Sequence, residues 1–152
     1  MDKSFSPLIA DTPESDSAYS ICRLSHPAPW SRKVFMDCMT SPYFAYVMIQ
    51  EGKVLGYYIG LLVAEEATLM DVAVAESSRN QGLGRLLVEH FIRMAESKSA
   101  SESWLEVRAS NTHAIRLYEC MGFETITVRK DYYSGATPES AKEDAIIMRR
   151  IS

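Results

Sequence analysis

The sequence predicts one α/β domain built around a central mixed sheet that helices flank. Three strand-like apolar runs come first, at residues 43–50, 54–63 and 67–74, and helical and strand-like patterns alternate after them. Strands followed by such an alternation are typical of a sheet covered by helices. The chain has 152 residues, of which 47% are hydrophobic, so it is long enough to bury one sizeable core.

Local patterns place the individual elements along this path. Ser31 is a good helix N-cap, and Gly52 marks a turn between two strands. Gly122 stands where the end of a helix favours a left-handed residue. The segment 18–24 fits a short helix or a strand, and its pattern does not decide between them. The other predicted elements are helices at 31–39, 83–95 and 112–121 and strands at 104–107, 126–130 and 145–149.

The predicted domain covers residues 18–152. Residues 1–17 are rich in Ser, Asp and Pro, so we expect a loosely held start there. A second irregular stretch, 134–142, separates the last two strands. The longest apolar run, 54–64, is too short to span a bilayer. The chain also begins without the basic start and apolar centre of a signal peptide, so we expect neither a membrane span nor secretion.

Composition indicates a cytoplasmic protein that does not bind nucleic acid directly. Its three cysteines, Cys22, Cys38 and Cys120, are odd in number and lack metal-ligand spacing, so we expect reduced thiols and no metal. A net charge of −4 argues against general nucleic-acid binding and suits a cationic partner. The oligomeric state is not fixed by any pattern, and we expect a monomer or a weak dimer.

The most informative segment is a glycine-rich turn that follows an apolar strand and opens an amphipathic helix. A helix N-terminus has unpaired backbone N–H groups and the positive end of the helix dipole, which together favour an anion such as a pyrophosphate. Two glycines leave room for a phosphate to approach the backbone, and an arginine at each end can add charge-assisted contacts. The turn reads Arg79-Asn80-Gln81-Gly82-Leu83-Gly84-Arg85.

Two common phosphate loops are excluded by this segment. A nucleoside-triphosphate loop ends in Gly-Lys-Ser/Thr, whereas Gly84 is followed by Arg85 and Leu86. A dinucleotide fingerprint needs three spaced glycines, and only two occur here. The pattern R/Q-x-x-G-x-G/A of an acyl-CoA pyrophosphate loop remains, beside an ordinary strand-to-helix turn that contains glycine.

The motifs downstream of this loop resemble the GCN5-related N-acetyltransferase (GNAT) superfamily. A strand leads to Asn111, a helix and then Gly122-Phe123, in the order that the family has after its loop. The match is closer to the RimI type, which acetylates the N-terminal alanine of a small-subunit ribosomal protein. It runs from about residue 26 to residue 148 and implies a single GNAT-type domain with a mostly antiparallel sheet. The matching segments are His26–Ser31, Glu66–Leu69, Gln81–Arg85, Trp104–Asn111 and Glu143–Met148.

The resemblance implies acetyl-CoA as cosubstrate and a ribosomal-protein N-terminus as acceptor. It places the pyrophosphate on the loop from Arg79 to Arg85. The pantetheine arm runs beside a strand whose backbone pairs with it as if a strand were added, and a backbone N–H there can face the thioester oxygen. Asn111 resembles the family residue that contacts this arm, and its position before a helix also fits an N-cap. The strand residues concerned are Val72, Ala73 and Val74.

The resemblance also implies two catalytic residues, Glu106 and Tyr118. Alternation alone places Glu106 on the solvent side of a strand whose neighbours face the core, but the family has its general base at this position. Tyr118 alone fits a core aromatic residue with a satisfied hydroxyl, whereas the family has a general acid there that protonates the departing CoA thiolate. An N-terminal α-amine has a pKa of about 8, so a carboxylate that acts directly or through one water suffices as base.

Aromatic segments are expected to flank the peptide groove. Pro29-Trp30 and Tyr132-Tyr133 resemble the family segments that do so. His26 either borders the entrance or packs within its loop.

We therefore expect acetyl transfer to an N-terminal amine. One alternative keeps the reaction and changes the acceptor to a small amine or a lysine side chain. Another is a non-catalytic acyl-CoA-binding module, although a module of that kind needs neither a base nor an acid. The stretch 134–142 looks longer than the RimI type leads us to expect, which leaves the width of the groove open.

Overall fold

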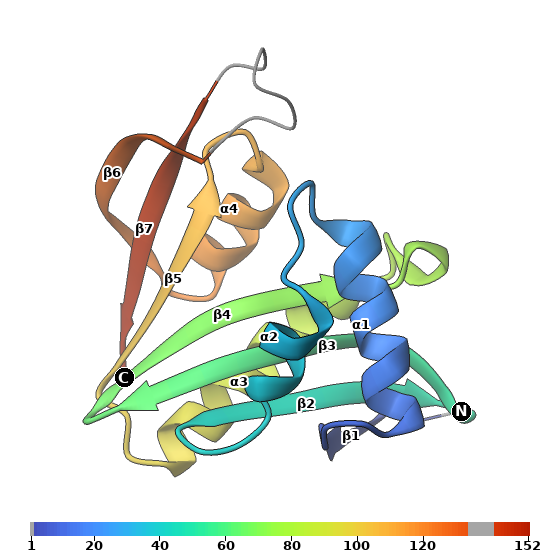
Figure 1. Ribbon diagram of the computed structural model, residues 1–152. Helices are drawn as coiled ribbons and strands as arrows, with labels where there is room; N and C mark the ends of the chain where they lie inside the picture. The colour runs from blue at the N-terminus through green and yellow to red at the C-terminus, as the bar shows by residue number, and fades with distance from the viewer. Residues whose placement is uncertain (1, 134–141) are drawn as a thin grey trace.

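The computed structural model describes residues 2–133 and 142–152, and these form a seven-stranded sheet with helices on both faces (Figure 1). The strand order is β1-β2-β3-β4-β5-β7-β6. Only β4 and β5 pair in parallel, so the predicted mixed, mostly antiparallel sheet is confirmed. The elements are β1 (Ser4–Pro7), α1 (Pro13–Ser25), α2 (Arg32–Asp37), β2 (Tyr43–Gln50), β3 (Lys53–Val63), β4 (Glu66–Val74), the short 3₁₀ helix η1 (Glu76–Ser78), α3 (Leu83–Ser97), β5 (Glu102–Arg108), α4 (Thr112–Cys120), β6 (Glu124–Tyr133) and β7 (Glu143–Ile151).

Two hydrophobic clusters lie on opposite faces of the sheet. Alternation along β3 sends Tyr57 and Ile59 to the face covered by α1 and α2, and Tyr58 to the face covered by α3. In Figure 1, α1 and α2 lie in front of the sheet, and α3 passes behind it. The central strands are therefore buried on both sides and form a rigid support for the residues at their ends.

The sheet splits at its parallel pair. β4 and β5 are paired only from Glu66 to Leu69 and from Glu102 to Leu105, after which the two strands diverge (Figure 1). β5 continues to pair with β7 up to Arg108, whereas β4 continues to pair with β3 up to Val74. The second half of β4 therefore has no ladder partner on the side that faces β5.

The start of the chain is held more firmly than the sequence indicates. Residues 4–7, which we expected in a loosely held start, pair with β2 as an edge strand. The helix α1 then begins at Pro13, and the side chain of Thr12 caps it by accepting a hydrogen bond from Ser15 N–H. The undecided segment 18–24 is thus the second half of a helix.

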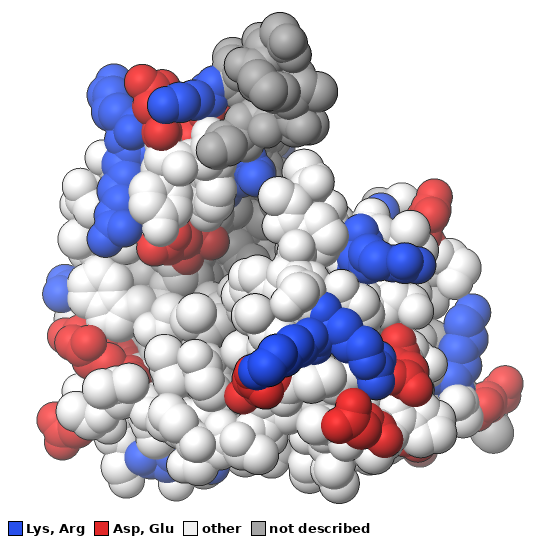
Figure 2. All heavy atoms as spheres, viewed as in Figure 1, with Lys and Arg blue, Asp and Glu red and all other residues white. Residues whose placement is uncertain are grey.

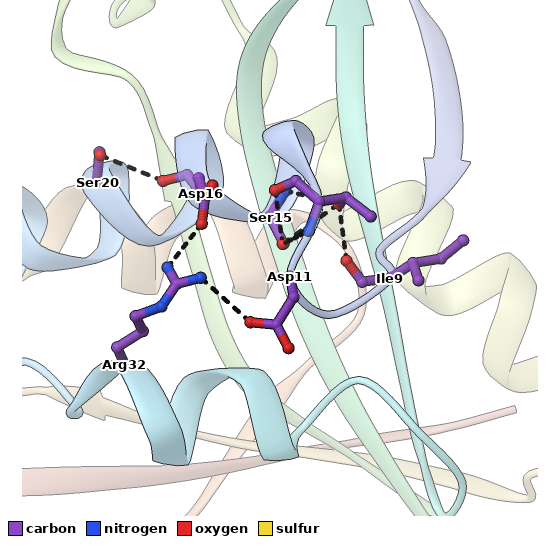
Figure 3. Close-up of polar contacts among 7 residues, drawn as sticks. Ile9, Asp11, Ser15, Asp16, Ser20 and Arg32 are labelled. Atoms are coloured by element: carbon purple, nitrogen blue, oxygen red, sulfur yellow. Dashed lines mark hydrogen bonds and ion pairs between the residues drawn. The ribbon is translucent and has the colours of Figure 1, made fainter.

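One arginine ties this N-terminal segment to the next helix. Arg32 of α2 lies 3.2 Å from an Asp11 carboxylate oxygen and 2.6 Å from one of Asp16, as Figure 3 shows. The capping box and this double ion pair explain why a Ser- and Asp-rich stretch is ordered: its polar side chains bond to the backbone and to Arg32.

Other predicted elements agree with the structure to within a few residues. The side chain of Ser31 caps α2 by accepting from Val34 N–H, and Gly122 follows α4 with a φ of +96°. β6 is longer than predicted and includes Tyr132 and Tyr133, which we had assigned to no element. The irregular stretch 134–142 lies, except for its last residue, outside the described residues. No described helix is long and apolar enough to cross a membrane.

Candidate active site

A cavity of about 470 Å³ occupies the split between β4 and β5. Its walls come from these two strands, from the segment between α1 and α2, from α4 and from the end of β6. Figure 2 shows this face hollowed between the part that contains β5 and β7 and the helices in front of the sheet. The cavity brings together eight of the predicted site residues: Pro29, Trp30, Val72, Glu106, Asn111, Tyr118, Tyr132 and Tyr133.

Glu106 enters the cavity from β5. Its neighbours Leu105 and Val107 are only 2% and 6% exposed and face the core, so alternation turns Glu106 the other way. That direction is the cavity, because β4 has moved away from β5 at this level. One Glu106 carboxylate oxygen lies 3.8 Å from Nη1 of Arg129 on β6, and both side chains remain partly exposed. The carboxylate is therefore accessible to a ligand.

Tyr118 reaches the cavity from α4 and is otherwise buried. Its ring packs edge-on against Phe123, 5.9 Å between centroids. Among the described residues its hydroxyl has no hydrogen-bond partner, and the residue lines the cavity. Burial, followed by the charges of Asp71 and Tyr133, raises the pKa of Tyr118 to about 12. The phenol therefore holds its proton throughout the physiological range.

Arg108 and Glu143 fix the rim of the cavity on the β5 side. The Arg108 guanidinium stacks 4.3 Å from the centre of the Tyr133 ring and forms a 3.4 Å ion pair with Glu143. Glu143 also accepts a hydrogen bond of 2.7 Å from Ser110 N–H, and these bonds lower its pKa. The contacts join the end of β5 to the start of β7 and orient the aromatic ring that lines the cavity.

The glycine-rich loop lies at the N-terminus of α3. Gly82 has a φ of +75° and no side chain caps the helix. The first intrahelical bond at this end runs from Leu86 N–H to the Gly82 carbonyl, so the amides that precede it have no acceptor in the helix. A Cβ at Gly82 would meet no atom within 4 Å, and one at Gly84 would meet only Leu117, 3.8 Å away. The loop is thus an open cradle that a side chain would partly fill.

The two arginines of the loop are already engaged. Arg79 donates from Nε to the Val74 carbonyl at 3.3 Å and from a terminal nitrogen to the Ser25 hydroxyl at 3.2 Å. Arg85 donates to Glu89 one turn later at 3.0 Å. Arg79 therefore anchors the loop to the end of β4, and the backbone amides at the start of α3 are left available to an anion.

The predicted pantetheine strand presents its main chain rather than its side chains. Ala73 packs into the cluster under α1, and Val72 and Val74 pack toward the α3 face. A β-bulge opposite Gly60 leaves Met70 without a partner on β3. Beyond Leu69 this strand edge faces the cavity without a ladder partner, so its polar groups can pair with a ligand in extended form.

Asn111 has the structural role that its position indicated. Its side-chain oxygen accepts a hydrogen bond of 3.2 Å from Ala114 N–H and caps α4. The same residue lines the cavity, so the cap and a ligand contact are compatible. Contact with a cofactor stays a prediction.

Sequence reasoning missed Asp71, which lines the cavity from β4. Its carboxylate accepts a hydrogen bond from the Tyr57 hydroxyl and lies 2.8 Å from Nε2 of His26. His26 lines the cavity as well, which agrees with the first of its two interpretations, that it borders the entrance. A carboxylate inside an apolar strand was a signal that could have indicated it. Cys22 lies beside this pair, and one ligand atom from each of the three residues lies within 4.8 Å of the others. All three cysteines are free thiols.

These residues fit an acyl thioester of coenzyme A. The side-chain-free cradle at Gly82 and Gly84 accommodates a pyrophosphate, and the unpaired edge of β4 matches an extended arm with amide groups. Glu106 and Tyr118 line the cavity beside that edge, whereas the loop from Arg79 to Arg85 contributes no residue to its lining. The class of protein is thus an acyltransferase that uses coenzyme A.

Comparison with known proteins agrees with this class. The profile of the Acetyltransferase (GNAT) family matches residues 13–123. The chain is 41% identical over 138 residues to the [ribosomal protein bS18]-alanine N-acetyltransferase of Escherichia coli K12, and the match covers 91% of each chain. It is 39% identical over 140 residues to the same enzyme of Salmonella typhimurium, and that match covers 92% of this chain and 93% of the relative. A crystal structure of the Escherichia coli ribosomal-protein-S18-alanine N-acetyltransferase superposes with a TM-score of 0.89 at 39% identity, covering 99% of this chain and 94% of that one.

The chain belongs to the GNAT acetyltransferase family. It is an acetyl-CoA-dependent N-acetyltransferase, as predicted.

Proposed function

We propose that the protein transfers an acetyl group to the α-amine of an N-terminal alanine on a ribosomal protein in the cytoplasm. The observation that supports the chemistry is the cavity that holds both Glu106 and Tyr118. The acceptor is proposed from the relatives, which act on ribosomal protein bS18 and match nearly the whole chain. The cavity is also open to an extended peptide, with Trp30 and the end of β6 on its walls.

The loop and β4 hold the cosubstrate in this proposal. Backbone amides at the start of α3 bind the pyrophosphate, and Arg79 keeps that loop against β4. Bound acetyl-CoA supplies an activated acetyl group as a thioester. A backbone N–H on the open edge of β4 stabilises negative charge on the thioester oxygen, and such a donor is worth about 3 kcal/mol.

Glu106 is the general base in the proposed reaction. An α-amine with a pKa of about 8 needs little driving force to lose a proton, so a carboxylate acting directly or through one water is sufficient. Arg129, 3.8 Å away on β6, pairs with the carboxylate and leaves it partly exposed. General-base catalysis of this kind accelerates a reaction by a factor of about 10² to 10⁴.

Tyr118 is the general acid. With its pKa raised to about 12, the phenol is protonated whenever a thiolate has to leave. Complete transfer to an alkyl thiolate, whose thiol has a pKa of about 8.5, is uphill by about 5 kcal/mol at equilibrium. The hydroxyl therefore acts first as a hydrogen-bond donor to the sulfur, and the proton follows as the bond to sulfur breaks.

A peptide assay tests the acceptor. Three peptides of one sequence are incubated with the enzyme and acetyl-CoA: one begins with a free alanine, one has that alanine N-acetylated, and one has an internal lysine added. We expect one acetyl group on the first peptide, none on the second, and only the N-terminal one on the third, located by tandem mass spectrometry. Equal reaction of the blocked peptide, or acetylation of the lysine alone, would contradict the proposal.

A further inference from the structure

A second ionisable cluster lies on the wall of the cavity formed by β4 and the end of α1. Asp71, with a side chain only 7% exposed, accepts hydrogen bonds on both carboxylate oxygens, one from the Tyr57 hydroxyl and one from His26. The proposed reaction uses neither Asp71 nor His26. A buried carboxylate and an imidazole on the wall of the same cavity as Glu106 therefore need an explanation of their own.

The hydrogen bond to Asp71 decides which nitrogen of His26 is available. An ionised carboxylate only accepts hydrogen bonds, so Nε2, 2.8 Å away, carries a proton in both forms of the ring. Neutral His26 then has its lone pair on Nδ1. This nitrogen has no partner among the residues that the structure describes, and His26 lines the cavity with 36% of its side chain exposed.

The charged and titratable groups around His26 make it a better base than an ordinary imidazole. Its hydrogen bond to Asp71 raises the pKa of His26 above the ordinary 6.5, against burial and the charge of Arg108 on β5, which lower it. Burial also raises the pKa of Tyr57 on β3 and of Cys22 on α1, so both stay protonated and add no charge. The ring is thus closer in basicity to an α-amine, whose pKa is about 8.

The chemistry requires two proton acceptors. An α-amine with a pKa of about 8 is mostly an ammonium at neutral pH, with three protons on nitrogen, whereas the amide product has one. Two protons therefore leave the nitrogen for each acetyl group transferred, and Glu106 can accept one of them at a time.

On the basis of the proposed function, we propose that His26 accepts the first of these protons at Nδ1, converting the substrate's ammonium to an amine, while Asp71 holds the ring. Glu106 then takes the second proton as the N–C bond forms, and Tyr118 gives a proton to the departing sulfur. The proton on Glu106 afterwards returns to the Tyr118 phenolate through water, so both groups regain their starting forms. His26 returns its proton to water, because 36% of its side chain is exposed. Net, one ammonium and one thioester give one amide, one thiol and one proton.

A metal site is the competing interpretation of the same three side chains. Cys22, His26 and Asp71 have suitable atoms within 4.8 Å of one another. Both oxygens of Asp71 are already bonded, however, and burial keeps Cys22 as a thiol, which is the form that does not bind metal. The geometry points to a proton network.

The pH profile of His26→Gln tests the inference. We expect kcat/KM for the alanine peptide to fall about tenfold at pH 7, since about one-tenth of an α-amine is neutral there, and to equal wild type near pH 9. His113→Gln, on the exposed face of α4, is the matched control and should follow wild type throughout. A loss that is the same at every pH indicates a structural role and overturns the inference, as does no loss at any pH. Reactions contain EDTA, and inactivation of wild type by EDTA would overturn it in favour of the metal.

A pH titration of the histidine ring signals by NMR, without substrate, separates this inference from the proposed function. The chain has three histidines, so the His26 ring signals are assigned by their loss in His26→Gln. We expect His26 to titrate above 6.5 in wild type and lower in Asp71→Asn. An unchanged His26 pKa in Asp71→Asn overturns the inference alone. Failure of wild type to acetylate the peptide at any pH contradicts the proposed function, while the titration still reports whether Asp71 tunes His26.

Discussion

Replacement of Glu106 by glutamine removes the proposed base and leaves the shape of the site in place. Glutamine has the same length but cannot accept a proton at neutral pH. The only ion pair lost among the described residues is the one with Arg129, at 3.8 Å and with side chains 37% and 55% exposed. A partly exposed pair of this kind contributes at most about 1 kcal/mol, so the variant should fold. Loss of general-base catalysis should lower kcat by about 10² to 10⁴, or about 3 to 5 kcal/mol in the barrier.

Two measurements on Glu106→Gln separate chemistry from binding. Steady-state assays with the alanine peptide give kcat, and calorimetry gives the affinity for CoA, which should match wild type because the loop at α3 is untouched. Glu124→Gln, an exposed carboxylate at the start of β6 that does not line the cavity, is the control and should be as active as wild type. A kcat for Glu106→Gln within threefold of wild type would refute its role as base.

Three further changes test the acid, the loop and the strand support. Tyr118→Phe should lower kcat at least tenfold with little change in Tm. Wild type should lose no activity from ionisation of Tyr118 below about pH 11, because that phenol has a pKa of about 12. A fall in wild-type activity near pH 9 that is absent from the variant would contradict this. Gly82→Asp should weaken CoA binding at least tenfold by calorimetry, whereas Gly52→Asp, at the same kind of left-handed position (φ +77° against +75°) but in the β2–β3 turn outside the loop, should not; equal weakening would show that strain alone is responsible. Gly56→Ala should lower the free energy of unfolding by about 1–3 kcal/mol, because its Cβ would lie 2.7 Å from the Ala73 carbonyl oxygen on β4, and an unchanged Tm would mean that β4 shifts freely.

Patterns of local origin were readable from the sequence. The alternation around Glu106 correctly gave a side chain facing away from the core, and the glycine at 122 marked the end of α4. Caps at Ser31 and Asn111 were also local, because a side chain bonds to an amide three residues ahead. Such features can be recognised in the sequence because only a few neighbouring residues determine them.

The start of the chain was misjudged for a physical reason. Ser, Thr, Asp and Pro are common both in loops and in helix caps, so the capping box at Thr12 was indistinguishable by composition from a loose segment. The strand at residues 4–7 has few apolar residues and depends on pairing with β2, some 40 residues away in sequence. Long-range pairing leaves no periodic pattern in a four-residue strand.

The site was predictable in part. The loop and the two proposed catalytic residues followed from a resemblance between ordered motifs, whereas Asp71 did not. Its place in the cavity depends on the split between β4 and β5 after Leu69, and nothing in the sequence of either strand marks where they diverge. The partner of Asp71, His26, is 45 residues away in sequence, so the pair exists only in the folded chain.

A crystal structure with bound CoA tests the central claim most directly. The account predicts the pyrophosphate on the backbone amides at the start of α3 and the sulfur within about 3.5 Å of the Tyr118 hydroxyl, in the cavity that also holds the Glu106 carboxylate. A sulfur atom beyond hydrogen-bond reach of Tyr118 and outside that cavity, with the pyrophosphate still on the loop, would contradict the account.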